Sequence, residues 1–126
     1  SAWIAIEDAT IENSCLQIMP GSHKKIFNHI NITNRLKAAN EFTKMADPKS
    51  LPNLDIVSLE MKAGQFVIFN DLLLHHSREN LSKKSRLGLV SRLTIPIVKV
   101  YHEEIFQGHE LILISGEDKY SHNKLR

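Results

Sequence analysis

The sequence has one cysteine, Cys15, and so lacks the pair that an internal disulfide requires. It also lacks an apolar run of the roughly 18 residues that a membrane-spanning helix needs, and its first residues do not read as a signal peptide. These absences predict a cytoplasmic protein that does not cross the membrane, since thiols stay reduced in that compartment. The apolar neighbours Leu16 and Ile18 indicate that Cys15 is buried and inert.

The balance of charge excludes further classes of function. The chain has 16 basic and 14 acidic residues and a net charge of +2, with no block of like charge, so no nucleic-acid partner is expected. It has no glycine-rich phosphate loop, no GxSxG motif and no CxxC motif, which argues against phosphate-loop, serine-hydrolase and dithiol chemistry. The remaining composition, 42% hydrophobic and 24% charged, is that of an ordinary globular domain.

Short alternating segments separated by turn residues make up most of the sequence. Alternation of apolar and polar residues is the pattern of a half-buried strand. The predicted strands are residues 1–6, 15–19, 55–61, 65–69, 72–77, 87–97 and 110–115. One short helix is predicted over residues 33–45, where Leu36, Ala39, Phe42 and Met45 form an apolar stripe. The fold class is therefore mainly β, a sandwich or jelly roll, and the length fits one domain or a piece of one.

The segment from Asn70 to Arg92 carries the strongest candidate site. Residues two apart on a strand share a face, so His75 and Ser77 point the same way, as do Arg86 and Arg92 on the next strand. A neutral imidazole binds metal ions at physiological pH, and a guanidinium grips a carboxylate with two parallel hydrogen bonds. This combination would hold a metal ion beside an organic acid.

Spacing alone favours a simpler interpretation, in which His75 is a hydrogen-bonded histidine and Arg86 pairs with an acidic neighbour. One histidine does not hold iron tightly, because non-haem iron oxygenases use two histidines and one carboxylate. His23 follows a Pro-Gly-Ser turn, and it either anchors that turn or lies at the mouth of a pocket. His102, beside two glutamates, is not expected to bind metal, because adjacent residues on a strand diverge.

The beginning of the sequence resembles the phytanoyl-CoA dioxygenase family. Residues 3–16, WIAIEDATIENSCL, are similar to its pattern W-x-A-[ILF]-[DE]-[DE]-[AS]-T-x-E-N-G-C-L. Residues 20–23 then supply its PGSH. The resemblance extends over roughly residues 3–95 and reverses the preference for the simpler interpretation.

The same family resemblance continues around the candidate site. Residues 64–69 are similar to the strand G-D-x-[VL]-x-F, and residues 73–77 to L-x-H-G-S, with Asn80 as the asparagine that follows. Arg86 has the family's spacing after His75.

The resemblance implies a double-stranded β-helix, the jelly-roll or cupin-like core of iron(II)- and 2-oxoglutarate-dependent oxygenases. It implies that His75 is the distal iron ligand and that Arg86 clamps the distal carboxylate of 2-oxoglutarate, assisted by Ser77. Trp3 would line the cosubstrate pocket. The residues expected beside the primary substrate, a small molecule, are Arg92 and His23.

Three departures from the family pattern bear on these expectations. Ser14 stands where the family has glycine, and His76 replaces the glycine of H-G-S. The sequence also lacks H-x-D, which in the family carries the proximal histidine and the aspartate upstream of the first of these strands. Residues 1–126 are therefore predicted to be the C-terminal part of a single oxygenase domain that lacks its first core strands. Residues 95–101 and 111–118 resemble the branch with aliphatic chlorinating enzymes, where H-x-[AG] replaces H-x-D and chloride takes the vacant position.

Two functions remain in competition. The first is a fragment of an iron(II)- and 2-oxoglutarate-dependent oxygenase that hydroxylates or chlorinates an unactivated C–H bond and is inactive as this chain alone. Its cofactors would be iron(II), 2-oxoglutarate and, for a halogenase, chloride. The second is a metal-free β-sandwich remnant that binds a partner or self-associates. Missing strands would leave exposed sheet edges, through which a homo-oligomer could form.

Overall fold

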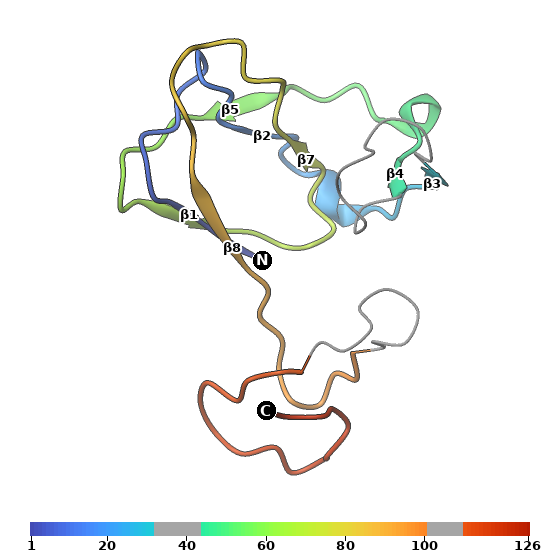
Figure 1. The fold of residues 1–126 in the computed structure, drawn as a ribbon. Helices are drawn as coiled ribbons and strands as arrows, with labels where there is room; N and C mark the ends of the chain where they lie inside the picture. The colour runs from blue at the N-terminus through green and yellow to red at the C-terminus, as the bar shows by residue number, and fades with distance from the viewer. Residues whose placement is uncertain (32–43, 101–109) are drawn as a thin grey trace. The chain divides into compact units, whose positions relative to one another are not determined.

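The chain divides into two compact units, each described here by itself. The first unit comprises Ser1–Asn31 and Lys44–Arg92, and the second comprises Ile32–Thr43 and Leu93–Arg126. Strands β1 to β8 all belong to the first unit (Figure 1). The structure, a computed structural model, describes residues 1–31, 44–100 and 110–126.

Two three-stranded antiparallel sheets form the framework of the first unit. The first sheet contains, in spatial order, β6 (Phe66–Ile68), β1 (Ala2–Ala5) and β8 (Gly88–Ser91). The second sheet contains β5 (Val57–Leu59), β2 (Leu16–Ile18) and β7 (His75–His76). In each sheet the central strand comes early in the sequence and its two partners come from far along it, so both sheets depend on long-range pairing.

The register of the first sheet separates the face that contains the buried Trp3 from a more open one, although Val90, on the face of Trp3, is itself 55% exposed. Trp3 pairs with Val67 on one side and with Val90 on the other, so these three side chains share a face. Phe66 and Leu89 belong to the opposite face, where they are 64% and 52% exposed. The alternating sequence thus produces strands whose two faces differ, but both carry apolar side chains.

The register of the second sheet assigns the two adjacent histidines of β7 to opposite faces. Gln17 pairs with Ser58 and His76, whereas Ile18 pairs with His75. This agrees with the strand parity predicted for His75 and His76.

A small buried cluster joins the two sheets. It consists of Trp3, Ala5, Ala9 and Cys15, of which Cys15 is 2% exposed and begins the segment leading into β2. A bridge between Ala9 and Met61, with two backbone hydrogen bonds of 2.8 Å, closes the cluster at the end of β5. Partly buried side chains that pack against it are Met61, Val67 and Phe69.

The predicted mainly β class is confirmed, and several predicted boundaries are corrected. The strand predicted over 87–97 ends at Ser91, opposite Ala2, where its pairing with β1 stops. The strand predicted over 72–77 is reduced to His75–His76, because Leu73 N donates to Asn70 O in a turn.

A third sheet pairs β3 (His29–Asn31) with β4 (Lys44–Ala46), and neither strand was predicted. The helix predicted over residues 33–45 lies outside the described residues except at its end, where β4 shows that the prediction is wrong. Two single-turn 3₁₀ helices complete the unit. They are η1 (Ser22–Lys24) and η2 (Pro48–Ser50).

The described part of the second unit is irregular. The strand predicted over 110–115 is wrong, because this segment makes only an isolated bridge between Leu111 and Leu125. Asn123 accepts a hydrogen bond from Val100 N at 2.7 Å and donates one to Val98 O at 2.9 Å. No helix in the described residues is long and apolar enough to span a membrane.

Candidate functional site

Trp3 and Gly88 form the tightest contact of the candidate site. Trp3 lies on the central strand of the first sheet and is 5% exposed. A Cβ atom at Gly88 would lie 2.4 Å from Cζ2 and 2.7 Å from Cε2 of the indole, well inside van der Waals contact. Glycine is needed at this position because the indole occupies the space of a side chain.

Arg86 lies over the same indole. Its Cζ atom is 5.6 Å from the ring centroid of Trp3, within the range of a cation–π contact. Among the described residues Arg86 takes part in no ion pair, which leaves its planar fork available to a carboxylate. Arg86 and Gly88 thus both contact Trp3, and the strand parity had predicted that these two residues share a face.

The ring of His75 is held from two directions. Its Nδ1 atom lies 2.7 Å from the carbonyl oxygen of Leu73, and a carbonyl can only accept, so Nδ1 carries the proton in this contact. Nε2 then keeps a free lone pair, the tautomer that a metal-binding histidine uses. The ring of Phe69 packs at a centroid distance of 4.8 Å and an interplanar angle of 57°.

The described residues do not account for a complete iron centre. They contain no group of three histidine, cysteine, aspartate or glutamate side chains that could hold a metal ion. An iron oxygenase site uses two histidines and one carboxylate, and His75 supplies one ligand of that set. His102 and His109 lie outside the described residues.

The other predicted site residues lie at exposed positions. Ser77 follows the end of β7, Arg92 follows the end of β8, and His23 lies in η1. In the described part of the chain, no hydrogen bond or ring contact joins His75 or Ser77 to Arg86. The structure therefore brings Arg86 to Trp3, while the roles assigned to the remaining residues stay predictions.

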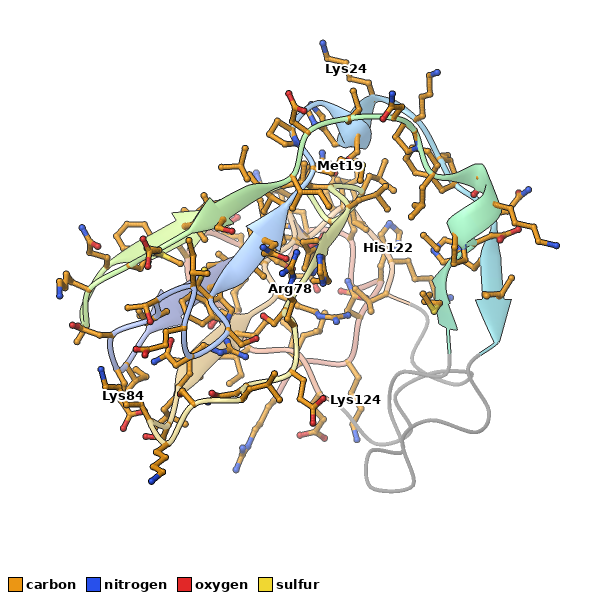
Figure 2. The ribbon with its side chains drawn as sticks, turned by 90° about the horizontal axis from the view of Figure 1, so that it is seen from above. Met19, Lys24, Arg78, Lys84, His122 and Lys124 are labelled. Atoms are coloured by element: carbon orange, nitrogen blue, oxygen red, sulfur yellow. The ribbon has the colours of Figure 1, made fainter. Side chains whose placement is uncertain are left out.

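The sequence did not predict a chain of side-chain hydrogen bonds across the second sheet. Gln17, 7% exposed, donates from Nε2 to Ser58 Oγ at 2.8 Å and accepts from Arg78 Nε at 3.2 Å. Arg78, labelled in Figure 2, is an exposed residue that reaches Gln17 with its Nε atom. A polar residue within the apolar strand predicted at 15–19 was the available signal.

Ser14 explains one departure from the family pattern. Its φ of 72° lies in the left-handed region, which glycine adopts with least strain, and the family has glycine at this position. The serine hydroxyl donates a hydrogen bond to the carbonyl oxygen of Arg78, just after the site segment. Ser14 thus combines a strained backbone with a contact that glycine could not make.

Cys15 has the character expected of a structural thiol. Burial raises the pKa of the Cys15 thiol, and the nearby Glu60 carboxylate raises it further. The sulfur therefore stays protonated and unreactive at neutral pH.

Comparison with known proteins connects this geometry with one family. A sequence profile described as Phytanoyl-CoA dioxygenase (PhyH) matches residues 1–88, which include Trp3, His75 and Arg86. A "Phytanoyl-CoA dioxygenase" from Arabidopsis thaliana is 42% identical over 84 residues, which are 67% of this chain and 28% of that protein. "Phytanoyl-CoA dioxygenase 1" from Oryza sativa subsp. japonica is 41% identical over 90 residues, 69% of this chain and 30% of that protein.

A third relative, from another organism, gives the same result. The "Phytanoyl-CoA dioxygenase domain-containing protein 1 homolog" from Dictyostelium discoideum is 38% identical over 85 residues, 67% of this chain and 30% of that protein. The chain thus spans less than a third of the length of each of these relatives. Because the family profile matches well over half of its residues, the chain belongs to the phytanoyl-CoA dioxygenase family.

Proposed function

We propose that the chain forms the 2-oxoglutarate-binding part of an iron(II)- and 2-oxoglutarate-dependent oxygenase acting on a C–H bond of a small molecule. The observation that carries this proposal is the half-buried Arg86, placed over Trp3 and without an acidic partner among the described residues. When bound, the iron and the cosubstrate activate dioxygen, and the protein provides binding, orientation and exclusion of water.

The proposal gives each residue of the site a distinct task. Arg86 binds the distal carboxylate of 2-oxoglutarate with its planar fork, and Ser77 adds a hydroxyl donor. Trp3 forms an apolar wall along the cosubstrate and supports the guanidinium. His75 offers Nε2 to the metal, because its Nδ1 is engaged with Leu73.

The finer parts of the proposal concern substrate and reaction outcome. Arg92 and His23 are the residues that we assign to the primary substrate. Hydroxylation is the outcome if the family's H-x-D accompanies this segment in the active protein, and chlorination, with bound chloride, if H-x-[AG] does. The proposed location is the cytoplasm, since the described cysteine is a free, buried thiol.

Binding of 2-oxoglutarate tests the proposal directly. Trp3 is the only tryptophan, so its fluorescence and its single indole NMR signal report on the site. The ligands are 2-oxoglutarate and, as a matched control, 2-oxobutyrate, which has the keto acid but no second carboxylate. The proteins are the wild-type chain, Arg86→Ala and Arg86→Lys.

We expect 2-oxoglutarate to bind better than 2-oxobutyrate and Arg86→Ala to weaken its binding about ten-fold or more, as expected when a charged hydrogen-bonding partner is lost. Arg86→Lys should restore only part of the affinity, because an ammonium is a point charge rather than a planar fork. The NMR spectrum of each variant checks that it is folded. Equal affinity of a folded Arg86→Ala variant and the wild type would refute the proposal.

A metal-free binding or self-association module is the second candidate function. It is favoured by the open face of the first sheet, where Phe66, Ile68 and Leu89 are 64%, 67% and 52% exposed. Strands β6 and β8 are also edges of that sheet and could pair with another chain. Light scattering after size-exclusion chromatography tests this function: a monomer at high concentration argues against it, and a stable homo-oligomer supports it.

A further inference from the structure

The turn that connects β1 to β2 grips the residues on both sides of Arg86. One carboxylate oxygen of Glu7, Oε2, accepts hydrogen bonds from Ser85 Oγ at 2.8 Å and from Leu87 N at 2.9 Å. In the other direction, the backbone N–H groups of Ile6 and Glu7 both donate to Leu87 O, at 3.0 and 3.2 Å. The residues before and after Arg86 are therefore tied to the same short segment.

Asn13 adds a buried anchor to this arrangement. It is 3% exposed, and its Nδ2 donates to Ser85 O at 3.1 Å and to Asp8 O at 2.8 Å. Its Oδ1 accepts from Thr10 N at 2.7 Å and from Thr10 Oγ1 at 3.2 Å. Both donors and the acceptor of the amide are thus satisfied, as a buried polar side chain requires.

These contacts fix the backbone around Arg86. The charged group of Arg86, in contrast, has no acidic partner in the described chain. The carboxylate of Glu7 is hydrogen-bonded to both sequence neighbours of Arg86, and no ion pair joins it to the guanidinium among the described residues. It bonds instead with Ser85 and Leu87, so it positions the arginine without neutralising it. A backbone that is already fixed on both sides of Arg86 reduces the reorganisation that binding requires.

We propose that Glu7, supported by Asn13, is a positioning residue of the 2-oxoglutarate site: it fixes Ser85 and Leu87 so that Arg86 stays over Trp3 with its fork open to a carboxylate. This inference rests on the proposed function. It assigns a task to Glu7 and Asn13, the first and last residues of the sequence stretch E-D-A-T-I-E-N, which the cosubstrate itself does not need to touch.

The test compares substitutions in this turn that leave Arg86 in place. Glu7→Ala removes both acceptor contacts, and Glu7→Gln keeps one oxygen able to accept. Ser85→Ala removes one exposed donor to Glu7 and leaves the core untouched. Glu12→Ala is the matched control, because this glutamate is in the same turn but lies 3.6 Å from Lys84 and is 70% exposed.

We expect Glu7→Ala to weaken 2-oxoglutarate binding about five-fold, the equivalent of one hydrogen bond, and to shift the Trp3 indole signal. Glu7→Gln and Ser85→Ala should each cause about a two-fold loss, a fraction of that bond. Binding of 2-oxobutyrate, which lacks the clamped carboxylate, should not change in any of them. Glu12→Ala should match the wild type in both readouts.

The possible failures are distinguishable. If Arg86→Ala weakens binding but Glu7→Gln and Ser85→Ala bind 2-oxoglutarate as the wild type does, the positioning role is wrong and the proposed function stands. If Arg86→Ala has no effect either, the proposed function fails first. Should Glu7→Ala not fold, the comparison of Glu7→Gln and Ser85→Ala with Glu12→Ala still decides the question. A loss that is equal for 2-oxoglutarate and 2-oxobutyrate would indicate a merely structural role and overturn the inference.

Discussion

The carboxylate side of the candidate site and its histidine side are built in different ways. On the carboxylate side, Trp3 is 5% exposed, Gly88 is in contact with it, and hydrogen bonds fix both neighbours of Arg86. On the histidine side, His75 and Ser77 are exposed, and β7 is two residues long. The difference teaches that the described residues hold the backbone around Arg86 in place, as the proposed carboxylate clamp requires, whereas the proposed metal site needs ligands that they do not provide.

The largest expected effect comes from breaking the packed side. Gly88→Ala should lower the free energy of unfolding by about 2–3 kcal/mol, because the added methyl overlaps a buried indole that cannot move aside. Chemical denaturation measures the change. Leu89→Ala, the adjacent residue on the open face, is the control and should cost less than about 1 kcal/mol.

A second substitution tests whether the contact with Trp3 causes the loss of stability in Gly88→Ala. Trp3→Phe introduced into Gly88→Ala should recover part of the lost stability, since the smaller ring leaves room for the methyl. A double variant that shows only the sum of the two single losses would mean that the contact between these two residues is not the cause.

The next prediction concerns the hydrogen bond that connects Ser14 with the backbone on the histidine side of the site. Ser14 has a left-handed backbone and donates its hydroxyl to the carbonyl of Arg78, after Ser77. Ser14→Ala keeps the strain and loses the hydrogen bond, whereas Ser14→Gly loses the bond but relieves the strain. We therefore expect the glycine variant to be more stable than the alanine variant by about 1 kcal/mol in urea unfolding. The reverse order would show that the backbone at this position is not strained.

The contrast between the two sides also explains what could be read from the sequence. Alternation located β1, β2, β5 and β6, and parity placed Arg86 and Gly88 on one face of their strand, because both depend on the local period of a strand. That this face is the one that carries Trp3 follows only from the pairing of β8 with β1. The ends of the strands depend instead on the strands with which they pair. Strand β8, for example, ends opposite Ala2, at a point that no local sequence pattern marks.

Contacts between distant residues were beyond the same reasoning. The hydrogen bonds that Glu7 accepts from Ser85 and Leu87 join positions about eighty residues apart. The alternation of apolar and polar residues does not predict such contacts. Strand parity turns Leu87 away from the face of Arg86 and so predicts that Leu87→Ala harms stability more than cosubstrate binding. Leu87 is 57% exposed, however, so replacing it should have little effect on stability. Motif spacing identified the candidate site residues. The contacts that support these residues were identified only from the pairing of the strands.

Iron binding tests the histidine side of the candidate site. Because the described residues contain no group of three side chains that could hold a metal ion, this chain should bind iron(II) weakly, with an affinity no better than millimolar, and show no oxygenase activity alone. Anaerobic titration in the presence of 2-oxoglutarate measures it, and His75→Ala should change the result little. A charge-transfer band that saturates at micromolar iron and disappears in His75→Ala would contradict this prediction, because it would require a complete ligand set.

The smallest effect concerns an exposed ion pair in the turn that positions Arg86. A hydrogen bond from the Lys62 ammonium, with one from Ala63 N, holds the pKa of the Asp8 carboxyl below its ordinary value of 3.8. Because the folded-state pKa is the lower one, the stabilisation is fully present above that ordinary value and is lost as the pH falls through the folded-state pKa. Asp8→Asn should therefore reduce stability slightly near neutral pH, and the difference from the wild type should vanish in strong acid. Urea unfolding at both pH values, with Glu12→Gln as the control for loss of one exposed charge, measures it. A difference that persisted or grew in acid would show that Asp8 supports the turn through its shape and not through its charge.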